Sequence, residues 1–206
     1  MSRVYMSRVV EFRKFEERDI DFIYRCKNNE KLNSMIVGQF HPFSYEEASL
    51  WVHNCMKGDR QDLKFWAVCT NDEEKKIIGW TALSRIDRQN QSVYTHSIVI
   101  GDKNYQDGFA WLETVLFLFS YSFETLGMNR VYGESILGNK ASNLVESLMF
   151  MTREGLFRQA VFQNGRFYDI SYAAILKDEY FAHKAAGDYE IPAVIRRLKK
   201  LRKASI

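Results

Sequence analysis

One stretch of the chain joins a strand, a glycine-containing loop and an apolar helix, and it could bind phosphate. Ser92–Ile100 is rich in β-branched and aromatic residues, and residues 101–108 are polar with a glycine at each end. From Phe109 the apolar residues run too long for a strand, and Gly127 supplies a helix stop. Backbone N–H groups at such a helix start, together with the helix dipole, favour a bound phosphate. We therefore expect this loop to hold the pyrophosphate of a nucleotide-containing cofactor.

The loop does not carry the two common nucleotide-binding signatures. Only Gly108 and Ala110 fall where the fingerprint G-x-G-x-x-G would need glycines, and no Gly-Lys-Ser/Thr opens the helix. His96, in the strand before the loop, has a side chain whose pKa suits proton transfer, although a single strand histidine is more often structural. The sequence shows no Ser-His-Asp set, no Cys-His set and no metal-ligand spacing, so we expect no metal.

Length and composition indicate a soluble globular protein of one domain, or of one domain with a tail. The chain has 206 residues, and 46% of them are hydrophobic. Its three cysteines are scattered and do not form paired C-x-x-C motifs, which favours reducing cytoplasm over a disulfide framework. The first ten residues lack an apolar run of signal-peptide length. Residues 109–119 are apolar, but they are too few to span a membrane and include Glu113, so we expect a buried helix.

The basic character of the chain is concentrated near its end. The net charge is +3, and six basic residues lie in the run from Arg196 to Lys203, so the rest of the chain is mildly acidic. Residues 191–203 predict an amphipathic helix with an apolar stripe. This helix could bind nucleic acid, the ribosome or an anionic membrane, or it could dock on its own domain or on a second copy in a homodimer. We favour docking, and we expect a main domain over residues 1–180 and a tail over 181–206.

Local patterns predict strands that alternate irregularly with helices. A capping-box pattern begins a helix at Ser44 with Glu47 three residues later, and Asn164-Gly165 indicates a hairpin turn. The expected strands cover residues 9–15, 63–70, 76–85, 92–100, 130–137, 156–163 and 167–176. The expected helices cover residues 19–28, 44–57, 139–151 and 191–203, besides the one that starts at Phe109. A strand–helix–strand crossover over residues 92–137 gives a mixed, mostly antiparallel α/β sheet with one parallel strand pair and helices on both faces. Ligands bind such sheets at the carboxyl ends of the parallel strands, where the loop 101–108 lies.

The order of these elements resembles the GNAT N-acetyltransferase fold. Within it, the chain is most similar to ribosomal-protein N-terminal acetyltransferases and to amino-sugar-nucleotide N-acetyltransferases, over residues 9–180. The residues that carry the resemblance are Phe65-Trp66-Ala67-Val68, Ile78-Gly79, Ile100-Gly101-Asp102, Gly108-Phe109-Ala110, Tyr121-Ser122-Phe123, Leu126-Gly127, Asn129-Arg130-Val131, Asn139-Lys140-Ala141-Ser142, Arg153-Glu154-Gly155 and Asn164-Gly165-Arg166-Phe167-Tyr168-Asp169.

The resemblance implies an acetyl-CoA site and an acceptor site. It implies a glutamate that lines the acceptor site at Glu134, in the strand after the crossover. Asn139 and Ser142 would contact the pantetheine arm, cap their own helix, or do both. His41 could line the acceptor pocket, although a surface turn is the simpler interpretation. The residues expected to bind acetyl-CoA are Ile98, Val99, Ile100, Tyr105, Gln106, Asp107, Gly108, Phe109, Ala110, Asn139 and Ser142.

The chain departs from the family pattern at two places. The acetyl-CoA loop of the family reads Q/R-x-x-G-x-G/A; aligned on Gly108, the first position is Tyr105, and Gln106 takes it only if the loop is one residue short. Two further residues are unusual, because Asp107 brings a negative charge toward the expected pyrophosphate and Trp111 is bulky. In the helix after Asn139, Val145 stands where many relatives have a tyrosine that protonates the leaving thiolate, although many members of this branch also lack it.

Two functions remain open at this point. The first is acetyl transfer from acetyl-CoA to a primary amine, such as an amino sugar nucleotide, a protein N-terminus or another small amine. The amine must first lose a proton, which Glu134 or His96 could accept or relay. The second is a GNAT-fold protein with weak or no catalysis that binds a macromolecule or nucleic acid through its basic tail. The departures favour the second function, and the extent of the resemblance favours the first.

Overall fold

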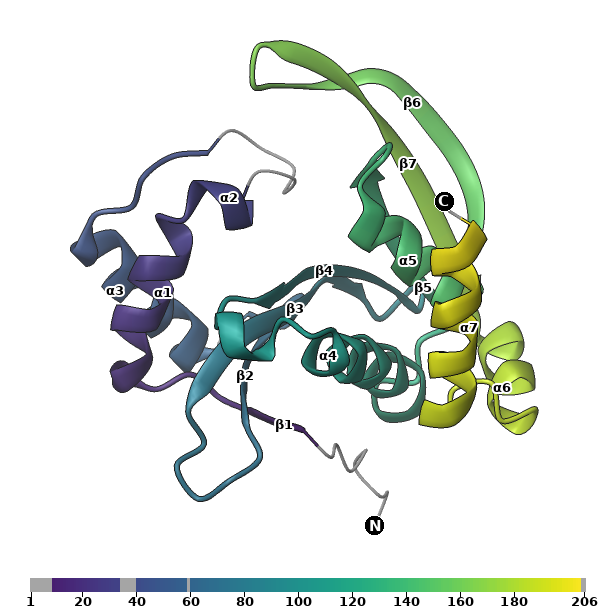
Figure 1. The fold of residues 1–206 in the computed structure, drawn as a ribbon, viewed down its shortest axis with the longest axis horizontal. Coiled ribbons are helices and arrows are strands. Elements are labelled where there is room, and N and C mark those ends of the chain that lie inside the picture. Colours follow the sequence, from purple (N-terminus) through teal and green to yellow (C-terminus); the bar gives the residue numbers. More distant parts are fainter. Residues whose placement is uncertain (1–8, 34–39, 59, 205–206) are drawn as a thin grey trace. The chain divides into compact units, whose positions relative to one another are not determined.

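The computed structural model describes residues 9–33, 40–58 and 60–204, and it divides into two compact units. The first unit contains described residues up to 33, 40–87 and 94–121, and the second contains residues 88–93 and 122–204. Figure 1 labels the helices and strands of both units in chain order.

The first unit is a sheet with helices on its two faces. Its strands follow the order β1-β2-β3-β4, and β1–β2 and β2–β3 are antiparallel. The strands are β1 (Val10–Arg13), β2 (Leu63–Thr70), β3 (Ile77–Asp87) and β4 (Ser92–Ile100), of which the first two residues belong to the second unit. The helices are η1 (Glu17–Asp19), α1 (Ile20–Lys27), α2 (Glu30–Asn33), α3 (Tyr45–Lys57), η2 (Lys103–Tyr105) and α4 (Phe109–Ser120).

Successive side chains of β2 point to opposite faces of the sheet and pack in two separate apolar clusters. Ala67 and Cys69 pack in the cluster that contains the buried faces of α1 and α3. Val68, between them, packs in a second cluster with Ile78 and with Ala110 of α4. Successive strand side chains point to opposite faces, so α1 and α3 cover one face of this sheet and α4 covers the other.

Capping residues fix the ends of α3, and a lysine of α1 packs against aromatic rings of α3 and of the sheet. Ser44 Oγ accepts from the Glu47 N–H at 3.1 Å, the Glu47 carboxylate accepts from the Ser44 N–H at 2.6 Å, and left-handed Gly58 ends α3. The Lys27 ammonium lies 4.8 Å from the ring centre of Trp51 and 5.3 Å from that of Trp80. Burial lowers the pKa of Lys27, and the rings stabilise the charge that remains.

Helix α4 is mostly apolar and has one buried carboxylate. Glu113 is 4% exposed, and its Oε2 accepts from the N–H groups of Val9 at 3.0 Å and Val10 at 3.2 Å. These two N–H groups lie at the start of β1, where that strand needs partners. Glu113 therefore joins α4 to β1 by hydrogen bonds that compensate for its desolvation.

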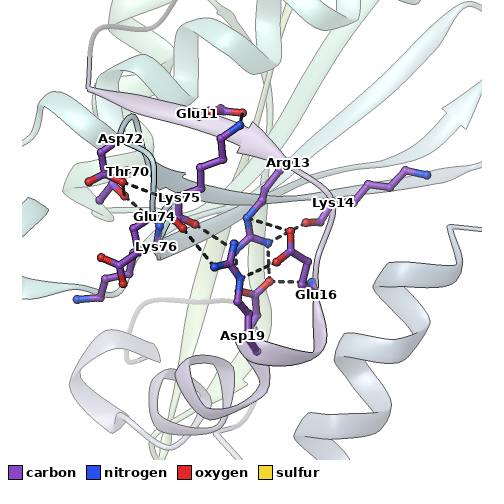
Figure 2. A network of polar contacts seen from close by, with 11 residues as sticks. Glu11, Arg13, Lys14, Glu16, Asp19, Thr70, Asp72, Glu74, Lys75 and Lys76 are labelled. Carbon is purple, nitrogen blue, oxygen red and sulfur yellow. Dashed lines mark hydrogen bonds and ion pairs between the residues drawn. The ribbon is translucent and has the colours of Figure 1, made fainter.

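A second buried carboxylate fixes the turn between β1 and α1 (Figure 2). Asp19 Oδ2 and Oδ1 each lie 2.8 Å from a terminal nitrogen of Arg13, and Asp19 also accepts from the Glu16 N–H at 2.9 Å. The Asp19 side chain is 1% exposed and that of Arg13 is 11% exposed. The hydrogen bond to Asp19 raises the pKa of Arg13, so the guanidinium keeps its charge. Lys75 and Glu11 form a much more exposed ion pair at 2.8 Å in the same network.

The second unit is built on a long hairpin. Its strands follow the order β5-β7-β6, and both pairs are antiparallel. Asn164 and Gly165 have φ values of 52° and 76°, as expected for a tight hairpin turn. The strands are β5 (Arg130–Ile136), β6 (Thr152–Gln163) and β7 (Arg166–Leu176), and the helices are η3 (Tyr121–Thr125, a π-turn whose first residue belongs to the first unit), α5 (Lys140–Leu148), α6 (Lys177–Ala185) and α7 (Ile191–Ala204).

Helix α7 docks within this unit. Val194 is fully buried, and residues of α7 contact α5. The Arg197 guanidinium lies 4.1 Å from the ring centre of Phe150 and donates to the Asp188 carbonyl at 2.6 Å. One of the six basic residues is therefore turned toward the protein, while Arg196 and Lys199 are exposed. The apolar face of α7 is used for docking, as the sequence predicted.

Most expected elements are confirmed, and the fold class is confirmed as mixed α/β with a mostly antiparallel sheet. The strands at 63–70 and 92–100 and the capping box at Ser44 have the predicted bounds. No helix was predicted where α2 and α6 lie. The hairpin strand β6 begins at Thr152 rather than at residue 156. Within the described residues, every helix is too short or too polar to cross a membrane.

We expect Asp19→Ala to destabilise the protein strongly, because it leaves the Arg13 charge buried without its partner. Removing one member of a buried ion pair costs about 3–5 kcal/mol. Lys75→Ala is the matched control, since exposed ion pairs contribute about 0–1 kcal/mol. Urea unfolding of both variants measures the difference in the free energy of unfolding. Equal decreases would show that burial of the Arg13–Asp19 pair does not increase its contribution to stability.

We expect deletion of residues 191–206 to lower the melting temperature clearly. A fully buried apolar side chain such as Val194 contributes about 1.5–3 kcal/mol. A binding arm for nucleic acid would behave differently: its removal would leave stability unchanged and abolish a salt-sensitive affinity. Thermal unfolding and nucleic-acid titration at two salt concentrations distinguish these outcomes, and unchanged melting with lost binding would contradict docking as the role of α7.

Candidate functional site

The loop after β4 begins at a close approach between two strands. The Ile78 carbonyl in β3 accepts from the N–H groups of Gly101 at 2.8 Å and Asp102 at 3.1 Å. At Gly79, a Cβ atom would lie 2.1 Å from the Val99 carbonyl oxygen. Only glycine allows this approach, so residue 79 decides how closely β3 can hold the end of β4.

Helix α1 packs directly on the first residue of the loop. A Cβ atom at Gly101 would lie 2.4 Å from Cys26 Sγ and 3.0 Å from Phe22 Cζ. Both contacting residues are buried and come from the inner face of α1. The loop is therefore fixed at its start by β3 and by α1.

The polar part of the loop is held by its own side chains. Asp102 Oδ1 accepts from the Asn104 N–H at 3.0 Å, and Asp102 Oδ2 lies 3.3 Å from Lys76 Nζ. Gln106 Nε2 donates to the Ile100 carbonyl at 2.8 Å and so joins the two ends of the turn. Tyr105 packs against the apolar cluster under α4. Of the two residues considered for the first position of the family loop, Gln106 is the one that bonds to the end of β4.

Helix α4 begins at a left-handed glycine. Gly108 is the N-cap with φ 103°, a conformation that side chains rarely adopt, and the first intrahelical bond runs from Leu112 N–H to the Gly108 carbonyl. Phe109 and Ala110 follow as the first helical residues, whose N–H groups have no partner within a helix. The Asp107 carboxylate Oδ1 accepts from the Phe109 N–H at 2.9 Å. An acidic side chain of the loop thus lies at the helix start that the sequence assigns to pyrophosphate.

His96 lies in β4 beside a strained residue. Its Nδ1 is 2.7 Å from Ser97 Oγ, and its ring stacks on Tyr94 and contacts the edge of Phe65. Ser97 has φ 58° inside the strand, a left-handed conformation that is unusual for a residue with a side chain. Such irregularities are frequent next to active sites. The sequence analysis missed Ser97, because serine gives no signal for a left-handed position.

Glu134 belongs to the second unit. It lies in β5, is half-buried, and pairs in register with Tyr172 of β7. Its neighbour Ser135 is buried and donates to Glu146 at 3.3 Å. A half-buried carboxylate in a strand interior retains access to solvent and can accept a proton.

The start of α5 has the capping geometry that the sequence predicted. Asn139 is the N-cap, and its Oδ1 accepts from the N–H groups of Ala141 at 3.1 Å and Ser142 at 3.4 Å. Val145, one turn further, is half-buried. The capping interpretation of Asn139 is confirmed, and its contact with a pantetheine arm stays a prediction.

The cysteines of the chain are free thiols, and a cavity in the second unit has a separate lining. Burial raises the pKa of the Cys26 thiol to about 11 and those of Cys55 and Cys69 to about 12, so none of the three is a thiolate at neutral pH. His41 is exposed. A cavity of about 550 Å³ in the second unit is lined by residues such as Glu146 and His183, and its lining includes none of the expected site residues. Among residues 9–33, 40–58 and 60–204, no cluster could hold a metal ion.

Relatives in curated sequence collections are N-acetyltransferases. The chain is 27% identical over 169 residues to the uncharacterized N-acetyltransferase YoaA of Bacillus subtilis, covering 80% of this chain and 92% of that protein. It is also 27% identical over 182 residues to the uncharacterized N-acetyltransferase p20 of Bacillus licheniformis, covering 87% and 99%.

Solved structures share the fold at low sequence identity. The spermidine N-acetyltransferase of Vibrio cholerae, in complex with CoA and spermine, superposes with a TM-score of 0.71 at 22% identity, covering 84% of this chain and 98% of that one. A GCN5-related N-acetyltransferase of Brucella melitensis has a TM-score of 0.72 at 23% identity, covering 92% and 85%.

The family model described as an acetyltransferase (GNAT) domain matches residues 10–148. That range runs from β1 to the end of α5 and includes the loop 101–108, Glu134 and Asn139. With two thirds of its length matched, and with the strand, glycine loop and helix in the order that the resemblance predicted, the chain belongs to the GNAT acetyltransferase family and is an acyltransferase that moves an acetyl group to an amine.

Proposed function

We propose that the protein is an acetyl-CoA-dependent N-acetyltransferase that acts on a primary amine, with residues 1–180 as the catalytic domain. The observation that carries the proposal is the start of α4, where left-handed Gly108 follows a loop fixed to β3. The glycine leaves room at the first N–H groups of a 12-residue helix, which suits a phosphate. The backbone of Ile98, Val99 and Ile100, at the end of β4, would hold the acetyl-pantetheine end.

The chain would contribute two effects to the transfer. Backbone N–H groups of β4 would polarise the thioester carbonyl, and a proton acceptor would keep the attacking amine neutral. The amine lone pair attacks the carbonyl carbon, the bond from carbon to sulfur breaks, and the amine proton passes to Glu134 directly or through water. His96 is the alternative acceptor, because its ring is half-buried and hydrogen-bonded through Nδ1. With Val145 at the place of the family tyrosine, solvent would protonate the leaving thiolate.

The acceptor belongs to one of several amine classes. The resemblance favours an amino sugar nucleotide or a protein N-terminus, and the Vibrio cholerae structure adds polyamines, because it contains spermine. Release of free thiol from acetyl-CoA, measured with each amine class in turn, tests the proposal. Acetyl-CoA binding with turnover of one class supports it, and failure to bind acetyl-CoA at all would refute it.

Gly108→Val should abolish acetyl-CoA binding, because a side chain there would lie between the helix N–H groups and the phosphates. The substitution also strains the backbone at φ 103°. Gly127→Val is the matched control, since Gly127 has φ 69° and no atom within 4 Å of its Cβ position. Calorimetry and thermal unfolding of both variants separate lost binding from lost stability. Unchanged affinity in a folded Gly108→Val protein would rule out this loop as the cofactor site.

Glu134→Gln should lower the turnover rate while the acetyl-CoA affinity stays unchanged. A general base contributes roughly 10²–10⁴ in rate, and glutamine cannot accept the proton. Glu124→Gln is the control in the same unit, because Glu124 bonds to Tyr180 and has no proposed part in the reaction. The pH–rate profiles of both variants are the measurement, and a wild-type profile for Glu134→Gln would assign the proton to His96 or to water.

A further inference from the structure

The cofactor loop contains a carboxylate that already binds the helix start. Asp107 immediately precedes the N-cap of α4, and its Oδ1 accepts from the Phe109 N–H at 2.9 Å. Phe109 is the first residue of the helix, so this N–H is one of the donors that the helix offers to an anion. Asp107 is exposed, so its side chain can rotate away without disturbing the core.

Two effects oppose the binding of a ligand phosphate at the same place. It must replace the carboxylate at the Phe109 N–H, and it must approach a negative charge in the same loop. The other carboxylate of the loop is arranged differently, because Asp102 bonds to Asn104 and lies 3.3 Å from the Lys76 ammonium. Asp102 therefore has a cationic partner, and these bonds join it to the loop and to Lys76.

We propose that Asp107 is an internal competitor for the pyrophosphate of the acyl donor and that it sets how tightly this chain holds the donor. The inference rests on the proposed function, since it requires acetyl-CoA to bind at the start of α4. Binding of acetyl-CoA then displaces the Asp107 carboxylate from the Phe109 N–H, and a phosphate oxygen accepts the hydrogen bond from that N–H in its place. The free enzyme keeps the helix start capped, at the expense of donor affinity.

The test is a comparison of two ligands on one substitution. Asp107→Asn removes the charge and keeps an oxygen that can accept from the Phe109 N–H, so the helix stays capped. Titration calorimetry should show CoA binding tightened by roughly 3- to 30-fold, the range expected for removing an anion from a helix N-terminus. Pantetheine, which has no phosphate, should bind the wild type and the variant equally. The gain for CoA should shrink as the salt concentration rises.

Asp102→Asn is the matched control, because it removes the same charge from the same loop without touching α4. It should leave the affinity for CoA within twofold of the wild type, on the order expected for a screened, paired charge. Asp107→Ser, which also caps without a charge, should repeat the gain of Asp107→Asn. Thermal unfolding of each variant verifies that the fold is retained.

Each outcome decides the proposal. A gain that is specific for CoA and for position 107 supports it. Equal gains for CoA and pantetheine, an equal gain in Asp102→Asn, or no gain in either Asp107 variant would overturn it while leaving the proposed function intact. Absence of CoA binding in the wild type and in all variants would overturn the proposed function and this inference together.

Discussion

The loop that we propose as the cofactor site depends on one backbone oxygen, the carbonyl of Ile78. It accepts from two successive N–H groups, those of Gly101 and Asp102, and so it fixes both the end of β4 and the direction in which the chain leaves it. The geometry requires glycine on each side of the contact. A side chain at Gly79 would collide with the Val99 carbonyl, and one at Gly101 would collide with Cys26 of α1. The start of the loop is thus determined by steric exclusion, which is less tolerant of substitution than apolar packing.

Carboxylates in the first unit have opposite consequences that depend on their surroundings. Glu113 and Asp19 are almost fully buried, and each is compensated by donors: two N–H groups of β1 for Glu113, and the Arg13 guanidinium with the Glu16 N–H for Asp19. Removing either carboxylate would leave buried hydrogen-bond donors without partners, and this strongly lowers the free energy of unfolding. Asp107 is exposed, and it bonds to the helix start at which we propose that the donor phosphate binds. Its charge is therefore expected to affect ligand affinity.

Residues with positive φ are found before the loop 101–108 and at its end. Ser97 in β4 and Gly108 at the start of α4 both have positive φ, and only the second is a glycine. A left-handed residue inside a strand interrupts the regular alternation and re-aims the neighbouring side chain, here His96. The hydrogen bond between His96 and Ser97 joins the strained position to the histidine that the sequence analysis selected. Left-handed residues also occur at Arg85 in β3 and at Gln159 in β6, so it is the bond to His96 that distinguishes Ser97.

The sequence by itself determined the elements whose causes are local. The capping box at Ser44, the turn at Asn164-Gly165 and the apolar runs of β2 and β4 each depend on residues within a few positions of one another, and each was predicted with its bounds. The order of these elements, with the glycine loop between β4 and α4, was sufficient for the family resemblance that the family model then confirmed. The amphipathic pattern of α7 likewise predicted that its apolar face docks.

Only the tertiary structure decided where the polar groups find partners. Glu113 looked like an exception in an apolar helix, and its partners lie 103 and 104 residues away in the sequence. Asp107 looked like an unfavourable charge near a phosphate site, and the structure identifies the N–H that it binds. The left-handed Ser97 gave no signal in the sequence, whereas helix α6 was missed although Glu179 caps its first turn and Lys, Glu and Ala favour a helix. Local propensity acts over one turn or one strand, whereas the satisfaction of buried and charged groups depends on which distant segments the fold brings together.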